Sequence, residues 1–174
     1  MASRATYVQD GARNLFVAST QAGVATSTAL STTQTGFTLT NPFGSGKTLV
    51  LLQVRGALTT APAAIATVVL AANVVPTAAA VTQTTPLTVR SANLGNGKAA
   101  VGLAASAVTL PAAPVVVRPL GGPVATGSVS QPQIVDDLEG SLQVAPGCAV
   151  SINSLTTAIS GVWSIVWEEI PEIA

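Results

Sequence analysis

The chain lacks histidine and contains one cysteine, Cys148, among its 174 residues. Without histidine there is no Ser-His-Asp or Cys-His arrangement, and Cys148 has no base to activate it as a nucleophile. Zinc sites made from histidine and cysteine clusters are excluded for the same reason. A single cysteine also cannot form an intramolecular disulfide, so no framework of the type found in small secreted domains is expected.

Aromatic and charged side chains are scarce as well. Aromatic residues make up 3% of the chain, so the 48% that is hydrophobic must be mainly Ala, Val, Leu and Ile. Charged residues make up 8%, against about 25% in an ordinary soluble domain. Such a surface must be covered by small polar residues or by another protein chain. Because the net charge is zero, long-range repulsion between copies is lost, and we expect self-association.

The few charges are unevenly distributed. Residues 1–130 carry seven basic residues and one acidic residue, a net charge of +6, whereas residues 131–174 carry six acidic residues and no basic one. These segments could lie side by side and neutralise one another within one fold, or opposite patches of neighbouring copies could meet. The basic residues are scattered singly and have no aromatic platform beside them, which disfavours direct binding of nucleic acid.

Long hydrophobic runs are absent. The nearest to a membrane span is residues 61–81, but Pro62, Asn73 and Pro76 interrupt it and most of the rest is alanine. It lacks the leucine density of a membrane helix, and we expect a strand, a loop and a second strand there. The apolar stretch 14–18 is too short for a signal peptide. A soluble protein with no membrane partner is therefore expected.

Short runs of β-forming residues, separated by Gly, Pro and Asn, begin at Gly36. Eleven prolines and fifteen glycines break most windows long enough for a helix, whereas the Val, Thr and Ile content favours strands. The spacing predicts an all-β sandwich or barrel. Residues 37–40 and 48–54 are expected to form a hairpin around the turn cluster 41–46. The expected strands are 37–40, 48–54, 66–71, 87–90, 99–103, 115–118, 134–138, 141–144, 149–155 and 161–168.

Residues 1–35 differ from the rest, because they are rich in Ala, Ser, Thr and Gln and show little periodicity. We interpret them as an extended N-terminal arm that needs a partner surface, with a flexible tail as the alternative. Residues 36–174 are assigned to one β-sandwich domain.

The strongest predicted strand is residues 161–168. Strand alternation places Trp163, Ile165 and Trp167 on one face, which brings both tryptophans of the chain together. Packing in the core is their expected role, and a platform on which a ligand stacks is the alternative.

Residues 44–48, Gly-Ser-Gly-Lys-Thr, resemble the end of a phosphate-binding P-loop. The full motif requires glycine at position 41, where this chain has Asn41. It also requires a helix after Lys47, since the helix N-terminus supplies the N–H groups that hold the phosphates. A strand is expected there instead, so nucleotide binding is disfavoured.

Acidic residues gather in two places near the carboxyl end. Asp136, Asp137 and Glu139 match no calcium-loop spacing, and we expect them to be solvated charges or partners of arginine. A second group, Glu168, Glu169 and Glu172, is expected to be the polar end of the last strand. Cys148 follows Pro146-Gly147 and is expected to be a small buried hydrophobe at the start of a strand.

Three segments together resemble a known family. These are Phe-Thr-Leu-Thr-Asn-Pro at 37–42 with Gly-Ser-Gly-Lys at 44–47 and the strand after it, the turn Pro146-Gly147, and the ending 163–171. From residue 36 onward the chain resembles the small jelly-roll virion proteins of tailed bacteriophages, of the capsid cement or decoration type.

The resemblance implies a jelly-roll β-sandwich that binds a capsid lattice in many copies and stabilises it. It also implies a virion location after assembly in the host cytoplasm, with the major capsid protein or other virion subunits as partners. A homo-oligomer, dimer or trimer, is expected.

We therefore predict a non-enzymatic structural protein, with no catalytic, cofactor-binding or metal-binding residue and no cofactor. A tail or head-fibre module that binds a host-surface glycan is the alternative. It would need a polar pocket with an aromatic floor, which only Tyr7, Trp163 and Trp167 and the three phenylalanines could supply. An enzyme built on the cluster Asp136, Asp137 and Glu139 is the third hypothesis.

Overall fold

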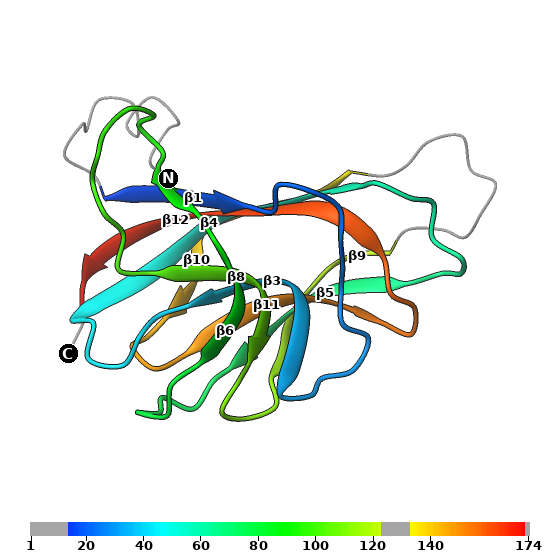
Figure 1. Ribbon diagram of the computed structural model, residues 1–174, viewed down its shortest axis with the longest axis horizontal. Helices are drawn as coiled ribbons and strands as arrows, with labels where there is room; N and C mark the ends of the chain where they lie inside the picture. Colours follow the sequence, from blue (N-terminus) through cyan, green and yellow to red (C-terminus); the bar gives the residue numbers. More distant parts are fainter. Residues whose placement is uncertain (1–13, 123–132, 173–174) are drawn as a thin grey trace.

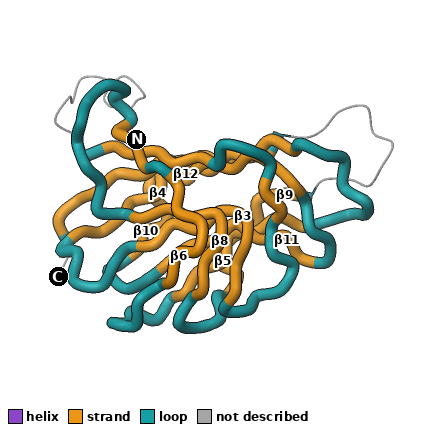
Figure 2. Tube along the Cα trace, viewed as in Figure 1, coloured by secondary structure: helices purple, strands orange, loops and turns teal. Residues whose placement is uncertain are grey.

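The computed structural model describes residues 14–122 and 133–172, and within them it contains strands and no helix. Two antiparallel sheets pack face to face, as the ribbon and tube views show (Figure 1, Figure 2). This confirms the all-β sandwich, whereas the jelly-roll order of strands stays a prediction. The first sheet has the order β10 (Ile134–Val144), β4 (Lys47–Leu58), β12 (Ser160–Pro171), β1 (Leu15–Ser19) and β7 (Val89–Ser91), and β2 (Val24–Ala25) pairs with β12. The second has the order β6 (Thr82–Leu87), β8 (Leu103–Thr109), β3 (Thr33–Thr40), β11 (Ala149–Leu155), β5 (Thr67–Asn73) and β9 (Val115–Gly121).

The expected hairpin around residues 41–46 is wrong. β3 pairs with β8 and β11 in the second sheet, and β4 pairs with β10 and β12 in the first. The turn cluster therefore carries the chain from one sheet to the other. The local pattern is a strand, a glycine-rich turn and a second strand. A hairpin and a crossing between sheets share this pattern, so the sequence does not distinguish them.

The division between an arm and a domain at residue 35 is also not what the structure has. β1 lies between β12 and β7, with Phe16 opposite Trp167, and β3 already begins at Thr33. Residues 14–35 thus belong to the sandwich. Their signal was the short alternation in β1, where Phe16 and Ala18 are buried. Residues 1–13 lie outside the described part of the chain.

Other predicted strands differ in their bounds. The segment 87–90 is split, because β6 ends at Leu87 in one sheet and β7 begins at Val89 in the other. The strand expected at 99–103 is wrong, since β8 starts at Leu103 and continues through the alanines that carry little β signal. The two runs 134–138 and 141–144 form one strand, β10, with a bulge between Asp137 and Leu142.

The core lies between the sheets and is built around β12. Trp163, Ile165 and Trp167 are fully buried, and the Phe16 ring lies 6.2 Å from that of Trp167. The Trp163 ring lies against Gly56 of β4, because a Cβ built at Gly56 would come within 2.5 Å of its Cε3 atom. The core role of both tryptophans is confirmed. The alternative, a stacking platform for a ligand, is wrong because no face of either ring is open to solvent.

The outer face of the second sheet is covered as well. Every residue of β11 from Ala149 to Ser154 is buried, although alternate residues of a strand face opposite sides. Loop segments provide the cover. Val81 packs on a small apolar cluster formed by Ala105, Val108, Leu110 and Ala149. The segment 74–81, which joins β5 to β6, therefore crosses over the outer face of this sheet.

Candidate functional site

The acidic cluster of β10 makes structural contacts. Asp136 accepts two hydrogen bonds from Arg118, at 2.6 Å from Nε and 3.0 Å from Nη2. This pair joins β10 of one sheet to β9 of the other, and the hydrogen bond and charge of Asp136 raise the pKa of Arg118. Asp137 accepts a hydrogen bond from Gln53, and Glu139 stands in the bulge with a positive φ of 49°. The described residues contain no group of three potential metal ligands.

The prediction that these acids serve as partners of arginine is confirmed for Asp136. It also shows one contact between the positive and the negative segment within a single copy. Arg118 comes from the positive segment and Asp136 from the negative one, and they meet across the seam between the sheets.

Glu169 differs from the expected polar end of the last strand, because it lies within β12. Its side chain is buried, and its carboxylate accepts hydrogen bonds from the backbone N–H groups of Val101 and Gly102, at 2.9 Å and 2.8 Å from Oε1. The indole Nε1 of Trp167 donates a third bond at 3.3 Å. Glu169 therefore holds the segment before β8 against β12, which is a structural role.

The P-loop look-alike is also structural. The strand expected after Lys47 is present as β4, which already begins at Lys47, and no helix follows. The buried Asn41 side chain donates hydrogen bonds to the carbonyl oxygens of Lys47 and Val144, at 2.7 Å and 2.8 Å, and Ser45 donates to Asn41 Oδ1. Cys148 is buried at the start of β11, as expected, and burial raises the pKa of its thiol.

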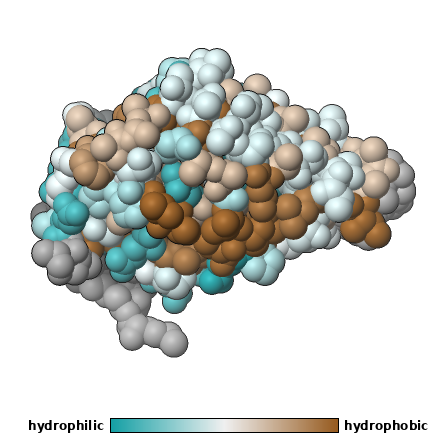
Figure 3. All heavy atoms as spheres, turned by 90° about the horizontal axis from the view of Figure 1, so that it is seen from below, coloured by the Kyte–Doolittle hydropathy of each residue, from teal (hydrophilic) through white to brown (hydrophobic). Residues whose placement is uncertain are grey.

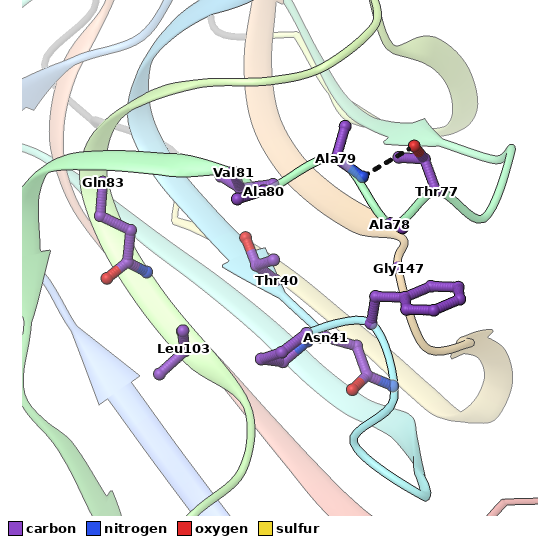
Figure 4. Close-up of a pocket in the computed structure, with 12 residues that line it drawn as sticks. Thr40, Asn41, Thr77, Ala78, Ala79, Ala80, Val81, Gln83, Leu103 and Gly147 are labelled. Carbon is purple, nitrogen blue, oxygen red and sulfur yellow. Dashed lines mark hydrogen bonds between the residues drawn. The ribbon is translucent and has the colours of Figure 1, made fainter.

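A cavity of about 250 Å³ lies between the outer face of the second sheet and the segment 74–81. Figure 4 shows Thr40 of β3 beneath Ala80 and Val81, with Gln83 and Leu103 on one side. Thr77, Ala78 and Gly147 lie on the other side. The segment is held there by the Thr77 N–H, which donates to the Gly147 carbonyl at 3.4 Å. Gly147 has to be glycine, because its φ is 82° and a Cβ would lie 2.7 Å from the Thr77 nitrogen.

Two residues that line this cavity each have a buried polar atom without a hydrogen-bond partner among the described residues, namely Thr40 Oγ1 and Gln83 Nε2, and neither atom is itself open to the cavity. Thr40 is only 5% exposed, so its hydroxyl cannot turn into bulk water. A buried polar group without a partner costs about 1–3 kcal/mol, and native proteins keep few of them. The amide nitrogen of Gln83 lies on the side that faces Thr40 (Figure 4).

The cavity has no charged lining residue, and its mouth is apolar. Phe43 and Leu103, which line it, are both exposed, and so are Val74 and Val75 in the segment that covers it. Apolar side chains also form a continuous band over the face seen in Figure 3. A second set of exposed apolar residues lies at the edge of the same sheet, where Val115, Val116 and Val117 of β9 are all at least 38% exposed. Exposed apolar groups of this kind mark contact surfaces.

Sequence analysis identified none of these residues as functional. Phe43 carried the only usable signal, because an aromatic ring within Pro-Phe-Gly-Ser-Gly stands on a turn and is expected to be exposed. Thr40 and Gln83 carried none, since threonine and glutamine in strands are common and only tertiary packing removes their partners.

Comparisons with known proteins add no relative. No protein-family model matches the chain, and neither a curated protein nor a solved structure matches it. The described residues also contain no helix that is long and apolar enough to cross a membrane.

Proposed function

We propose that this chain is a structural protein of a virion, a capsid cement or decoration protein that binds the capsid lattice in many copies and stabilises it. The observation that carries the proposal is that the acidic side chains form hydrogen bonds and an ion pair within the fold. Of the acids weighed as a catalytic or metal site, Asp136 pairs with Arg118 and Asp137 accepts a hydrogen bond from Gln53. The buried Glu169 likewise accepts hydrogen bonds that hold the fold together. The described surface presents exposed apolar residues, and the chain carries few charged ones.

The exposed valines of β9 support a homo-oligomer as the form that binds. Val115, Val116 and Val117 are consecutive residues of this edge strand, and all three are exposed. Proline at position 119 and two register shifts against β5 make this edge a poor template for adding another strand. Contact between copies would therefore use the valine side chains rather than backbone pairing.

Many copies are essential to this function. A cement protein needs only modest affinity at each contact, because copies that contact each other as well as the lattice bind with a raised effective concentration. Net neutrality suits such an arrangement, since crowded copies do not repel one another. The major capsid protein or another virion subunit is the proposed partner.

The experiment is deletion of the gene from the phage that encodes it. Particles with the chain should contain it at a fixed ratio to the major capsid protein, and cryo-microscopy should place its density on the lattice. Particles without it should release their genome at a lower temperature or lower osmotic stress. Particles that never contain the chain, or that are equally stable without it, would contradict the proposal.

The glycan-binding alternative is less well supported. Trp163 and Trp167 are buried in the core, so they cannot stack on a sugar. Phe16 and Phe37 are buried as well, whereas Phe43 is exposed. Tyr7, also named for this role, lies outside the described residues. Replacement of either tryptophan would now test folding rather than adsorption.

A further inference from the structure

We propose that Asn96, in the loop between β7 and β8, is a site of spontaneous covalent modification, where the side-chain amide is lost and aspartate and isoaspartate form. The reacting groups are the Asn96 side chain and the backbone nitrogen of Gly97. The modification requires no enzyme, and it converts a neutral residue into a carboxylate. The inference does not depend on the proposed function, because it concerns the chemistry of this loop alone.

The reaction has two steps. In the first, the Gly97 nitrogen attacks Cγ of the Asn96 side chain, the new N–Cγ bond closes a succinimide ring, and the Cγ–Nδ2 bond breaks. Nδ2 leaves as ammonia and takes up the proton of the Gly97 N–H. In the second, water opens the ring. Attack of water at Cγ gives aspartate, and attack at the backbone carbonyl carbon gives isoaspartate, so water is the only co-reactant and nothing is oxidised or reduced.

The residue that follows each asparagine separates Asn96 from the others. A side chain on the following residue crowds the attacking nitrogen and restricts the backbone, whereas glycine has no such side chain. The chain has six asparagines, and only Asn96 precedes glycine. Asn41 precedes Pro42, whose nitrogen carries no proton and cannot attack. The remaining four precede leucine, valine or serine.

The structure leaves both reacting groups free. Asn96 and Gly97 are exposed and lie outside the strands. Neither the Asn96 side chain nor the Gly97 N–H has a hydrogen-bond partner in the described part of the chain. The hydrogen bond that closes the preceding turn uses a different group, because the Asn96 N–H donates to the Asn93 carbonyl at 3.0 Å. A Cβ built at Gly97 would meet nothing within 4 Å, so open space surrounds the attacking residue.

The fold holds most of the other asparagines in place. Three of them are buried, namely Asn41, Asn73 and Asn153. A fourth, Asn14, donates a hydrogen bond from its side chain to the Glu169 carbonyl at 3.2 Å. A side chain fixed in this way is kept from the geometry of attack, on which an intramolecular reaction depends. Asn93 is exposed like Asn96 but precedes leucine, which makes it the internal comparison within the same loop.

The product changes the charge of the loop. The new carboxylate stands two residues before Lys98, and it lowers the net charge of the chain, which is zero before the reaction, by one unit. Because the reaction is spontaneous, the modified fraction grows with the age of the protein. Isoelectric focusing separates the two forms, since so few other groups contribute charge.

The first test is incubation of the full-length chain in mildly alkaline buffer, which favours the deprotonated, attacking form of the nitrogen. Trypsin cleaves after Arg90 and Lys98, so one peptide, 91–98, contains both Asn93 and Asn96, and its fragment ions distinguish them. Loss of the amide at Asn96 should be at least about tenfold faster than at Asn93. A sample unfolded in guanidinium chloride gives the rate without structure, and the folded chain should react at Asn96 within about tenfold of it.

The second test uses two variants. Gly97→Ala should slow the loss at Asn96 about tenfold, because the added methyl group restricts the backbone beside the attacking nitrogen. It should leave the melting temperature unchanged, since the Cβ meets no other atom within 4 Å. Asn93→Gln is the matched control, because it removes the other exposed asparagine of the loop, and the rate at Asn96 should not change.

Three results would overturn the inference. They are a loss at Asn96 no faster than at Asn93, a rate in Gly97→Ala equal to that of the wild type, and a folded chain that reacts more than about tenfold more slowly at Asn96 than the unfolded one. The last result would mean that the fold protects the site. None of these measurements involves a virion, so the proposed function stands or fails separately.

Discussion

At the scale of single residues, the fold depends on close approaches that large side chains make to glycine. The ring of Trp163 occupies the space where Gly56 would carry a side chain, and its Nε1 donates to the Val24 carbonyl at 3.0 Å. The indole is therefore held at one end by β4 and at the other by β2. A core with few aromatic residues gains much of its packing at such points.

We expect Gly56→Ala to lower the free energy of unfolding by about 1–3 kcal/mol, because the added methyl group would overpack a ring that cannot move aside. Urea denaturation of the purified variant measures this. Gly97→Ala is the control, since a Cβ at Gly97 meets nothing within 4 Å. Trp163→Phe should recover part of the loss in the double variant. Equal stability of Gly56→Ala and wild type would show that the ring does not lie against β4.

The predictable residues were those whose roles depend on alternation. Trp163 and Trp167 could be placed in the core from their spacing, and Cys148 from its position after a turn. Glu169 could not, because a buried carboxylate and a solvated one look alike until the chain brings backbone N–H groups to it. The cavity depends on where the segment 74–81 crosses the sheet, which is a long-range contact with no local pattern.

At the scale of elements, strands were predictable and their partners were not. The bounds of β11 coincide with the expected strand 149–155, since a β-branched run follows a clear turn. Partners are set by which sheet each strand enters, and most connections here change sheets, as at 41–46 and at Thr88. Local sequence signals strand and turn, but the choice of sheet depends on the packing of the whole core.

Glu169 illustrates how one side chain on β12 positions another element. We expect Glu169→Gln to destabilise the fold by roughly 1.5–3 kcal/mol, because hydrogen bonds to a charged acceptor are lost and an amide N–H₂ is placed near backbone donors. Hydrogen exchange should accelerate at the amides of Val101 and Gly102. Glu172→Gln, an exposed carboxylate just beyond the same strand, is the control and should change neither quantity. Unchanged exchange in Glu169→Gln would remove the positioning role.

At the scale of the whole molecule, the sandwich engages some of its few charged side chains in contacts within the fold and leaves apolar groups on its surface. Arg118 and Asp136 fasten the seam between β9 and β10, while Val115, Val116 and Val117 beside them face solvent. The ion pair thus joins the two sheets at this edge, and the valines beside it stay exposed. Because the chain carries few charges, covering that surface with a second copy costs little electrostatic free energy.

The expected consequence is self-association that depends on these valines. Sedimentation velocity of the wild-type chain should show a dimer or trimer that dissociates on dilution. Val116→Lys should shift the population to monomer, because each contact would bury an unpaired ammonium group beside its copy. Leu94→Lys is the control, since Leu94 is more exposed but lies in the loop after β7. If the wild-type chain stays monomeric at high concentration, the valines of β9 do not mediate self-association. Binding of these valines to the capsid lattice would then be the contact to test.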